Sequence, residues 1–99
     1  MTDIEIDDML GGTEEVAGWT LRIGDEGVIT QATDAMGRSF RLGQRLTANG
    51  RFGAPRGSVG VLVQIHRPFY DGRTSDILKV LFENPVALVV NMKIKDLEL

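Results

Sequence analysis

The sequence contains no cysteine and a single histidine among its 99 residues. The absence of cysteine excludes a disulfide framework, a thiolate metal site and a thiol nucleophile. It also suits the reducing cytoplasm, where we expect this protein to function. Long hydrophobic runs are lacking too, since the longest, Val86–Val90, has the length of a β-strand and not the roughly 20 residues of a membrane span. We therefore predict no membrane insertion, and no signal peptide, because the first ten residues are acidic.

Signatures of catalysis are also missing. The sequence has no G-x-S-x-G elbow, P-loop or dinucleotide fingerprint. His66 would need a positioned partner to act as a general base, and a histidine at the barrel rim that hydrogen-bonds a loop carbonyl is the favoured interpretation. The acids near the N-terminus lack the order of an EF-hand calcium loop, which favours a solvated acidic arm. We expect a protein that is not an enzyme and that holds no metal or other cofactor.

The composition is that of one small globular domain. Hydrophobic residues make up 42% of the chain and charged residues 25%, as in ordinary folded proteins. A chain of this length is too short for two independent cores. We therefore predict a single domain over residues 1–99.

Charge is distributed unevenly along the chain. The net charge is −3, but residues 1–34 hold nine acids against Arg22 alone. Residues 35–75 hold seven arginines against Asp71 alone, and residues 76–99 are nearly balanced. Two interpretations remain: the acidic and basic parts neutralise each other within the fold or a dimer, or the arginines form a binding surface.

The hydrophobic pattern is that of β-strands. Thr2–Val16 has weak helical or irregular character, and from Trp19 the apolar residues alternate with polar ones, which predicts a half-buried strand with Trp19 in the core. Ser58–His66 is predicted to be a long strand with valine and isoleucine at alternating positions. Further strands are predicted at Val28–Thr33, near Phe40 and Leu42, and at Gln44–Ala48, Asp76–Phe82, Val86–Met92 and Ile94–Leu99. Short strands between glycine-rich turns, without a convincing helix, predict an all-β barrel or sandwich.

Four sequence segments in the second half of the chain resemble segments of SH3-like barrels. They are Leu42-Gly43-Gln44-Arg45-Leu46, Gly57-Ser58-Val59-Gly60-Val61-Leu62-Val63, Leu78-Lys79-Val80-Leu81-Phe82-Glu83-Asn84-Pro85 and Asp96-Leu97-Glu98-Leu99. Residues 41–99 are similar to barrels of the KOW, Mib-Herc and nitrile-hydratase-β types. The resemblance implies a five-stranded small barrel at 41–99. Residues 1–40 lie outside it, and their charge and hydrophobic pattern predict an acidic arm at 1–18 and an additional β-hairpin at 19–40. This extension is expected to add strands to the barrel, to cover an open edge or to form a dimer contact. The resemblance implies little about function, because such barrels bind nucleic acid, ribosomes, peptides or other subunits.

Two loops combine arginines with aromatic residues. The loop over residues 49–57 holds three glycines, which let its backbone approach a ligand closely. Arginine forks bind phosphates, and an exposed phenylalanine can stack on a base. Alternatively, the phenylalanine plugs the barrel end and the arginines pair with the acidic arm. The candidate binding residues are Arg51, Phe52 and Arg56 in this loop and Arg67, Phe69, Tyr70 and Arg73 in the next.

These features predict a non-enzymatic protein-interaction domain, either a small homo-oligomer or a subunit of a complex. An alternative is a nucleic-acid- or ribosome-associated module that uses the arginine-rich segment, although nucleic-acid-binding domains are usually basic and this pI is about 5.0. A further alternative is an inhibitor whose acidic arm mimics nucleic acid.

Overall fold

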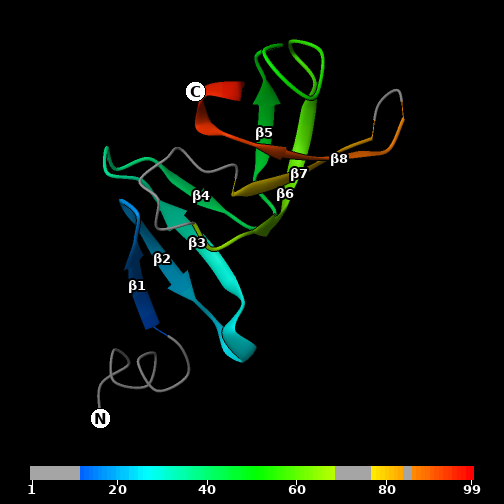
Figure 1. Cartoon of the computed structure of the whole chain (residues 1–99). Helices are drawn as coiled ribbons and strands as arrows, with labels where there is room; N and C mark the ends of the chain where they lie inside the picture. The colour runs from blue at the N-terminus through cyan, green and yellow to red at the C-terminus, as the bar shows by residue number, and fades with distance from the viewer. Residues whose placement is uncertain (1–11, 69–76, 84–85) are drawn as a thin grey trace.

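The computed structural model describes residues 12–68, 77–83 and 86–99. These residues form two antiparallel sheets, with strand order β1-β2-β3-β4 in the first and β8-β7-β6-β5-β9 in the second (Figure 1). The first sheet contains β1 (Gly12–Val16), β2 (Trp19–Ile23), β3 (Ile29–Thr33) and β4 (Ser39–Arg41). The second contains β5 (Arg45–Ala48), β6 (Val59–Ile65), β7 (Leu78–Phe82), β8 (Leu88–Met92) and β9 (Leu97–Glu98).

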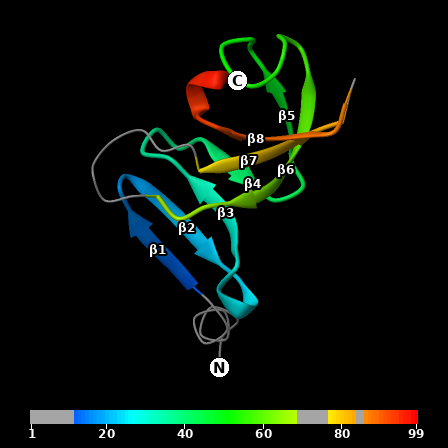
Figure 2. The ribbon, with the colours of Figure 1, turned by 45° about the vertical axis from the view of Figure 1, so that its right-hand side comes forward.

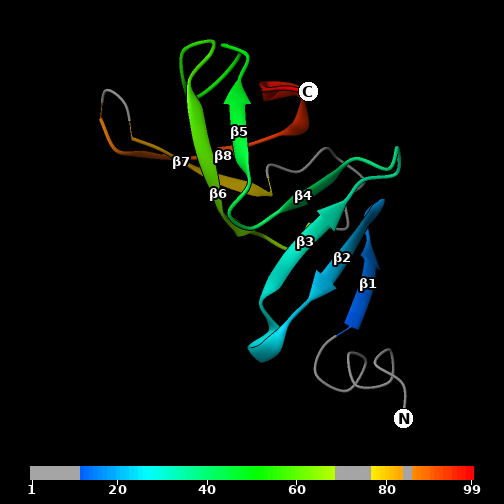
Figure 3. The same ribbon diagram turned by 180° about the vertical axis from the view of Figure 1, so that it is seen from behind.

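The predicted fold class, an all-β chain with a small five-stranded barrel and an N-terminal extension that adds strands, is confirmed. Two short 3₁₀ turns, η1 (Asp25–Gly27) and η2 (Ile94–Asp96), accompany the strands. The second sheet curls, and the N-terminal sheet lies beside one end of it, as the view from behind shows (Figure 3). No helix among the described residues has the length and apolar character needed to cross a membrane.

The strand β1 corrects the expectation of helical or irregular structure at Thr2–Val16. Gly12–Val16 pairs along its whole length with β2, from Gly12 opposite Ile23 to Val16 opposite Trp19. The connecting residues Ala17 and Gly18 both have positive φ angles, 51° and 84°, as tight hairpin turns require. The prediction failed because the partner strand, and not the local sequence, supplies the hydrogen bonds that define β1. Residues 1–11, the rest of the predicted acidic arm, lie outside the described part of the chain.

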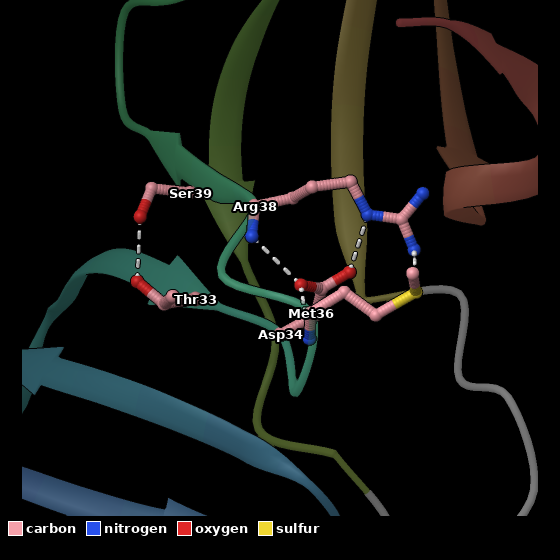
Figure 4. Close-up of polar contacts among 5 residues, drawn as sticks. All are labelled: Thr33, Asp34, Met36, Arg38 and Ser39. Atoms are coloured by element: carbon pink, nitrogen blue, oxygen red, sulfur yellow. Dashed lines mark hydrogen bonds and ion pairs between the residues drawn. The ribbon is translucent and has the colours of Figure 1, made fainter.

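The β3–β4 hairpin is closed by Asp34 (Figure 4). The Oδ1 atom of Asp34 accepts hydrogen bonds from the backbone N–H groups of Met36 at 3.0 Å and Arg38 at 2.8 Å. The Nε atom of Arg38 donates to Oδ2 of the same carboxylate at 2.7 Å. Beside this turn, the hydroxyl groups of Thr33 and Ser39 are 2.7 Å apart across the two strands. One carboxylate therefore satisfies the turn backbone and an arginine together.

A single hydrophobic core joins the two sheets. Trp19, Leu21 and Phe40 of the first sheet belong to the same buried cluster as the inward residues of the second. Trp19 is buried, as predicted, and its ring lies 6.2 Å from that of Phe40 in a tilted arrangement. The connection from β4 to β5 runs beside β6, because the N–H of Gly43 donates to the carbonyl of Leu62 at 2.8 Å.

The strand β6 does not keep its alternating residues on one side. Val59, Val61 and Val63 are exposed and Leu62 is buried, as alternation along a strand gives. Ile65 is buried as well, because the register shifts by one residue between Leu62 and Gln64. Such a bulge reverses the side on which following residues point. On the inner side, Gly60 lies against β7, where a Cβ atom would meet Val80 Cγ1 at 2.5 Å. On β6, Gly60 therefore faces the core together with Leu62, whereas the three valines face outward.

The final segment also differs from the predicted strand at Ile94–Leu99. Ile94–Asp96 forms the turn η2, and only Leu97 and Glu98 pair with β5. The Asp96 Oδ2 atom accepts a hydrogen bond from the N–H of Lys93 at 3.1 Å, and the Asp96 N–H donates to the Lys93 carbonyl at 2.9 Å. These bonds satisfy the backbone locally and turn the chain toward the loop of residues 49–57.

Candidate functional site

A cleft of about 490 Å³ lies between the loop of residues 49–57 and the C-terminal segment. The two segments lie side by side at the end of the molecule opposite β1 (Figures 1 and 2). The cleft is lined by Arg51, Phe52, Asn91, Lys93, Lys95 and Asp96. Its volume falls within the range of pockets that bind small molecules or single groups of a larger ligand. We refer to it as the basic–aromatic cleft.

The side chain of Asn49 holds both walls of this cleft. Its Oδ1 accepts a hydrogen bond from the N–H of Arg51 at 3.0 Å, which fixes the first turn of the loop. Its Nδ2 donates to the carbonyl of Lys95 at 2.6 Å. The backbone N–H of Asn49 also donates to the carbonyl of Asp96 at 3.0 Å. The positions of Arg51 and Lys95 are thus set by one residue that lies between them.

Glycines allow the loop to fold over strand β8. Gly53 has φ +84°, and a Cβ atom there would lie 2.4 Å from Cγ1 of Val90. Gly50 has φ +86°, and a Cβ atom there would lie 3.0 Å from Cβ of Arg56. Both positions combine a left-handed backbone with close contacts, and at Gly53 the contact leaves no room for a Cβ atom. Phe52 lies between these two close contacts, on a backbone held at both sides.

Phe52 is 59% exposed and forms part of the cleft. The alternative that Phe52 plugs the barrel end is therefore not what the structure contains. The interior is filled instead by residues of the strands, among them Phe82, Leu62 and Met92, all almost completely buried. A large apolar ring left in water beside a cleft is a feature of binding surfaces.

The cleft carries net positive charge. Arg51, Lys93 and Lys95 form no ion pair with the described part of the chain. The acid among the lining residues, Asp96, is 5% exposed, and its carboxylate accepts the Lys93 N–H. A buried carboxylate occupied by backbone leaves the three cations available to an anion from outside. The arginine offers a planar fork and the lysines offer point charges.

Two other predicted arginines pair with acids and do not line this cleft. Arg56 contacts Glu98, with 3.3 Å between Nε and Oε1, on an exposed part of the surface. Arg67 forms an ion pair with Glu14 of β1, which links the segment after β6 to the first sheet. Of these two contacts, only the pair of Arg67 and Glu14 joins the basic segment to the acidic one, as the neutralisation interpretation expects. The remaining predicted residues, Phe69, Tyr70 and Arg73, lie outside the described residues.

Comparisons with known proteins do not decide the assignment. No family model, curated protein or solved structure matches this chain. The resemblance of residues 41–99 to SH3-like barrels therefore stays a prediction.

The sequence did not indicate the C-terminal half of the cleft. Asn91, Lys93 and Lys95 lie in a stretch whose charges nearly cancel, so no local signal marked them. They reach the loop because β9 pairs with β5, with Thr47 opposite Glu98.

The side chain of His66 forms no hydrogen bond with the described residues, and its backbone N–H donates to the Ile77 carbonyl at 2.8 Å. Among all the residues that the structure describes, no group of three or more acids and histidines has the arrangement of a metal site.

Proposed function

We propose that this chain is a non-enzymatic interaction domain that binds an anionic partner in the basic–aromatic cleft. The observation that supports this function is the grouping of Arg51, Lys93 and Lys95 around one cleft, where they outnumber the single lining acid, Asp96, and form no ion pair within the described residues. Cations grouped at one cleft attract phosphate or carboxylate groups, although screening by salt and the negative net charge of the whole chain keep this attraction short in range. The cytoplasmic location stays a prediction from the sequence.

Calorimetric titration with inorganic polyphosphate, a polyanion without bases or peptide groups, tests this function. We expect binding at low salt that weakens as salt rises, because electrostatic contacts are screened. Arg51→Ala and Lys95→Ala should each weaken binding several-fold. Arg41→Ala is the matched control, since Arg41 is an exposed arginine of β4 that does not line the cleft. Equal affinities of the cleft variants and the control would show that the cleft is not the binding site.

The outer face of the second sheet favours a second candidate function, contact with a second copy of this chain. Val61, Leu81 and Val89 lie opposite one another across β6, β7 and β8 and form an apolar row. Val61 and Val89 are 37% and 51% exposed. Apolar groups gathered on one exposed sheet face mark protein interaction sites.

The charges around this row suit two copies of the same face. Arg45 lies opposite Val61, and Lys79 lies opposite Asn91, so both add positive charge to this side. Glu98 lies opposite Thr47 and adds negative charge at the β9 edge. A face with an apolar centre and both signs of charge at its margin can meet its copy about a two-fold axis.

Sedimentation equilibrium tests this second candidate. We expect the molecular mass of the native chain to rise with concentration and Val61→Glu to remain monomeric. The control is Val28→Glu, which places the same charge at a 49% exposed valine before β3. A native chain that is monomeric at every concentration would remove self-association and leave the cleft as the site of function.

A further inference from the structure

The exposure of Phe52 on a constrained backbone narrows the class of ligand further than the charge of the cleft does. The residue is 59% exposed, yet the backbone on both sides is constrained by the Asn49 turn and by the close packing of Gly53 against Val90. A ring carried on a fixed backbone loses little conformational entropy when a ligand covers it. The cleft can therefore bind a planar ligand group that stacks on the face of the Phe52 ring.

The neighbours of Phe52 supply the other contacts of such a ligand. Arg51 is adjacent in the chain, and Lys93 and Lys95 form the opposite wall. Asn91 also lines the cleft, and its side-chain amide makes no hydrogen bond with the described residues. An amide offers one acceptor and two donors, which is the chemistry that reads the edge of a base. A planar group with an anionic backbone is thus matched by an aromatic face, three cations and a neutral hydrogen-bonding group.

We infer that the anionic partner is single-stranded nucleic acid, with a base stacked on Phe52 and the adjoining phosphates held by Arg51, Lys93 and Lys95. This inference rests on the proposed function and names the ligand of the same cleft. A single strand is required because both faces of a paired base are covered by its neighbours in a duplex. An acidic peptide would use the same cations, but a carboxylate does not stack on the aromatic face of Phe52 as a nucleobase does.

Fluorescence anisotropy with three labelled probes tests the inference on the full chain. The probes are a mixed-sequence single strand, the same strand with abasic sites in place of its bases, and the corresponding duplex; each is prepared as DNA, and the single strand also as RNA. We expect the native chain to bind the single strand about 5- to 150-fold more tightly than the abasic strand, as the stacking of one base predicts. With three phosphates contacted, log affinity should fall with log salt at a slope of about −2.

Variants of Phe52 separate stacking from apolar contact. Phe52→Leu keeps an apolar side chain without a ring and should bind the single strand no better than the abasic strand. Phe52→Tyr keeps the ring and should retain the preference. Because Phe52 is exposed, neither substitution should alter the far-ultraviolet circular dichroism of the fold.

The outcomes distinguish this inference from the proposed function. If polyphosphate binds through the cleft but the abasic strand binds as tightly as the single strand, the inference is wrong and the anion-binding function remains. If Phe52→Leu binds the single strand as well as the native chain does, stacking is excluded, and an acidic peptide becomes the better candidate for the cleft. If neither polyphosphate nor any nucleic acid binds at low salt, both proposals fail together.

Discussion

Asn49 and Lys95 are joined by a hydrogen bond of 2.6 Å from the Asn49 side-chain amide to the Lys95 carbonyl. The two residues are 46 positions apart in the sequence, so this bond fastens the loop after β5 to the end of the chain. The same side chain accepts the N–H of Arg51. The separation of the cations across the cleft consequently depends on a residue that carries no charge itself.

Asn49→Ala should lower both stability and affinity. Loss of the two bonds is expected to reduce the free energy of unfolding by about 1–2 kcal/mol and to weaken polyphosphate binding several-fold, although all three cations remain. Urea unfolding and calorimetric titration measure the two effects. Asn91→Ala is the control for stability, because this exposed amide has no partner in the described structure, and its change should stay within about 0.5 kcal/mol. Equal stability losses in the two variants would contradict the role assigned to Asn49.

Gly53→Ala should displace the loop from β8. An alanine there must adopt φ +84° and place its Cβ atom 2.4 Å from Cγ1 of Val90. Left-handed backbone and overpacking together are expected to cost about 2–4 kcal/mol of the free energy of unfolding. Gly57→Ala is the matched control in the same loop, since Gly57 has φ +87° but no atom within 4 Å of an added Cβ. Its cost should be about 1–2 kcal/mol.

A double variant isolates the contact with Val90. Val90→Ala removes the two methyl groups that the new Cβ meets, so Gly53→Ala should cost less in that background than in the native chain. Urea unfolding of the four proteins measures the coupling. Identical costs in both backgrounds would mean that backbone strain alone explains the effect.

Ionisation of Asp34 should make stability depend on pH in the acid range. Burial acts to raise its pKa, but hydrogen bonds from the Arg38 and Met36 N–H groups and from the Arg38 guanidinium, together with the charge of Arg38, hold the pKa of Asp34 below its ordinary value. A carboxyl whose pKa is lower in the folded state stabilises the fold above its unfolded pKa of about 4. This contribution is lost as the pH falls through the lower folded pKa.

Asp34→Asn keeps the side-chain oxygen that accepts the two N–H groups but cannot ionise. We expect it to lower the free energy of unfolding by about 0.5–1.5 kcal/mol at neutral pH. The difference from the native chain should shrink between pH of about 4 and the lower folded pKa. Urea unfolding at a series of pH values measures this difference, with Asp25→Asn at an exposed aspartate as the control. A difference that is constant at all pH values would exclude the assigned ionisation.

The ion pair between Arg67 and Glu14 should contribute little to stability. The two side chains are 52% and 39% exposed. A double-mutant cycle with Glu14→Gln and Arg67→Gln is expected to give a coupling energy of about 0.2–1 kcal/mol that declines as salt rises. The cycle with Glu15→Gln in place of Glu14→Gln should give none. A large, salt-independent coupling would mean that this pair is a principal link between the sheets.

The positions of most strands from Trp19 onward could be read from the sequence, because they depend on short-range chemistry. Trp19, Leu21 and Ile23 alternate with polar residues, as a strand with one buried side must, and glycines mark the turns. The glycines at positions 50, 53 and 57 likewise predicted a loop that contains Arg51 and Phe52. Composition alone also excluded disulfides and thiolate chemistry, since these need residues that the chain does not contain.

Only the tertiary structure decided which of these residues act together. Pairing of β9 with β5 brings Lys95 to Arg51, and the bulge in β6 puts Val61 outside and Ile65 inside. Pairing also made a strand of Gly12–Val16, for which the sequence indicated weak helical or irregular character. Periodicity reports the side on which a residue points relative to its neighbours in the chain. Which side faces the core, and which distant cations share a cleft, depends on hydrogen bonds between segments far apart in the sequence.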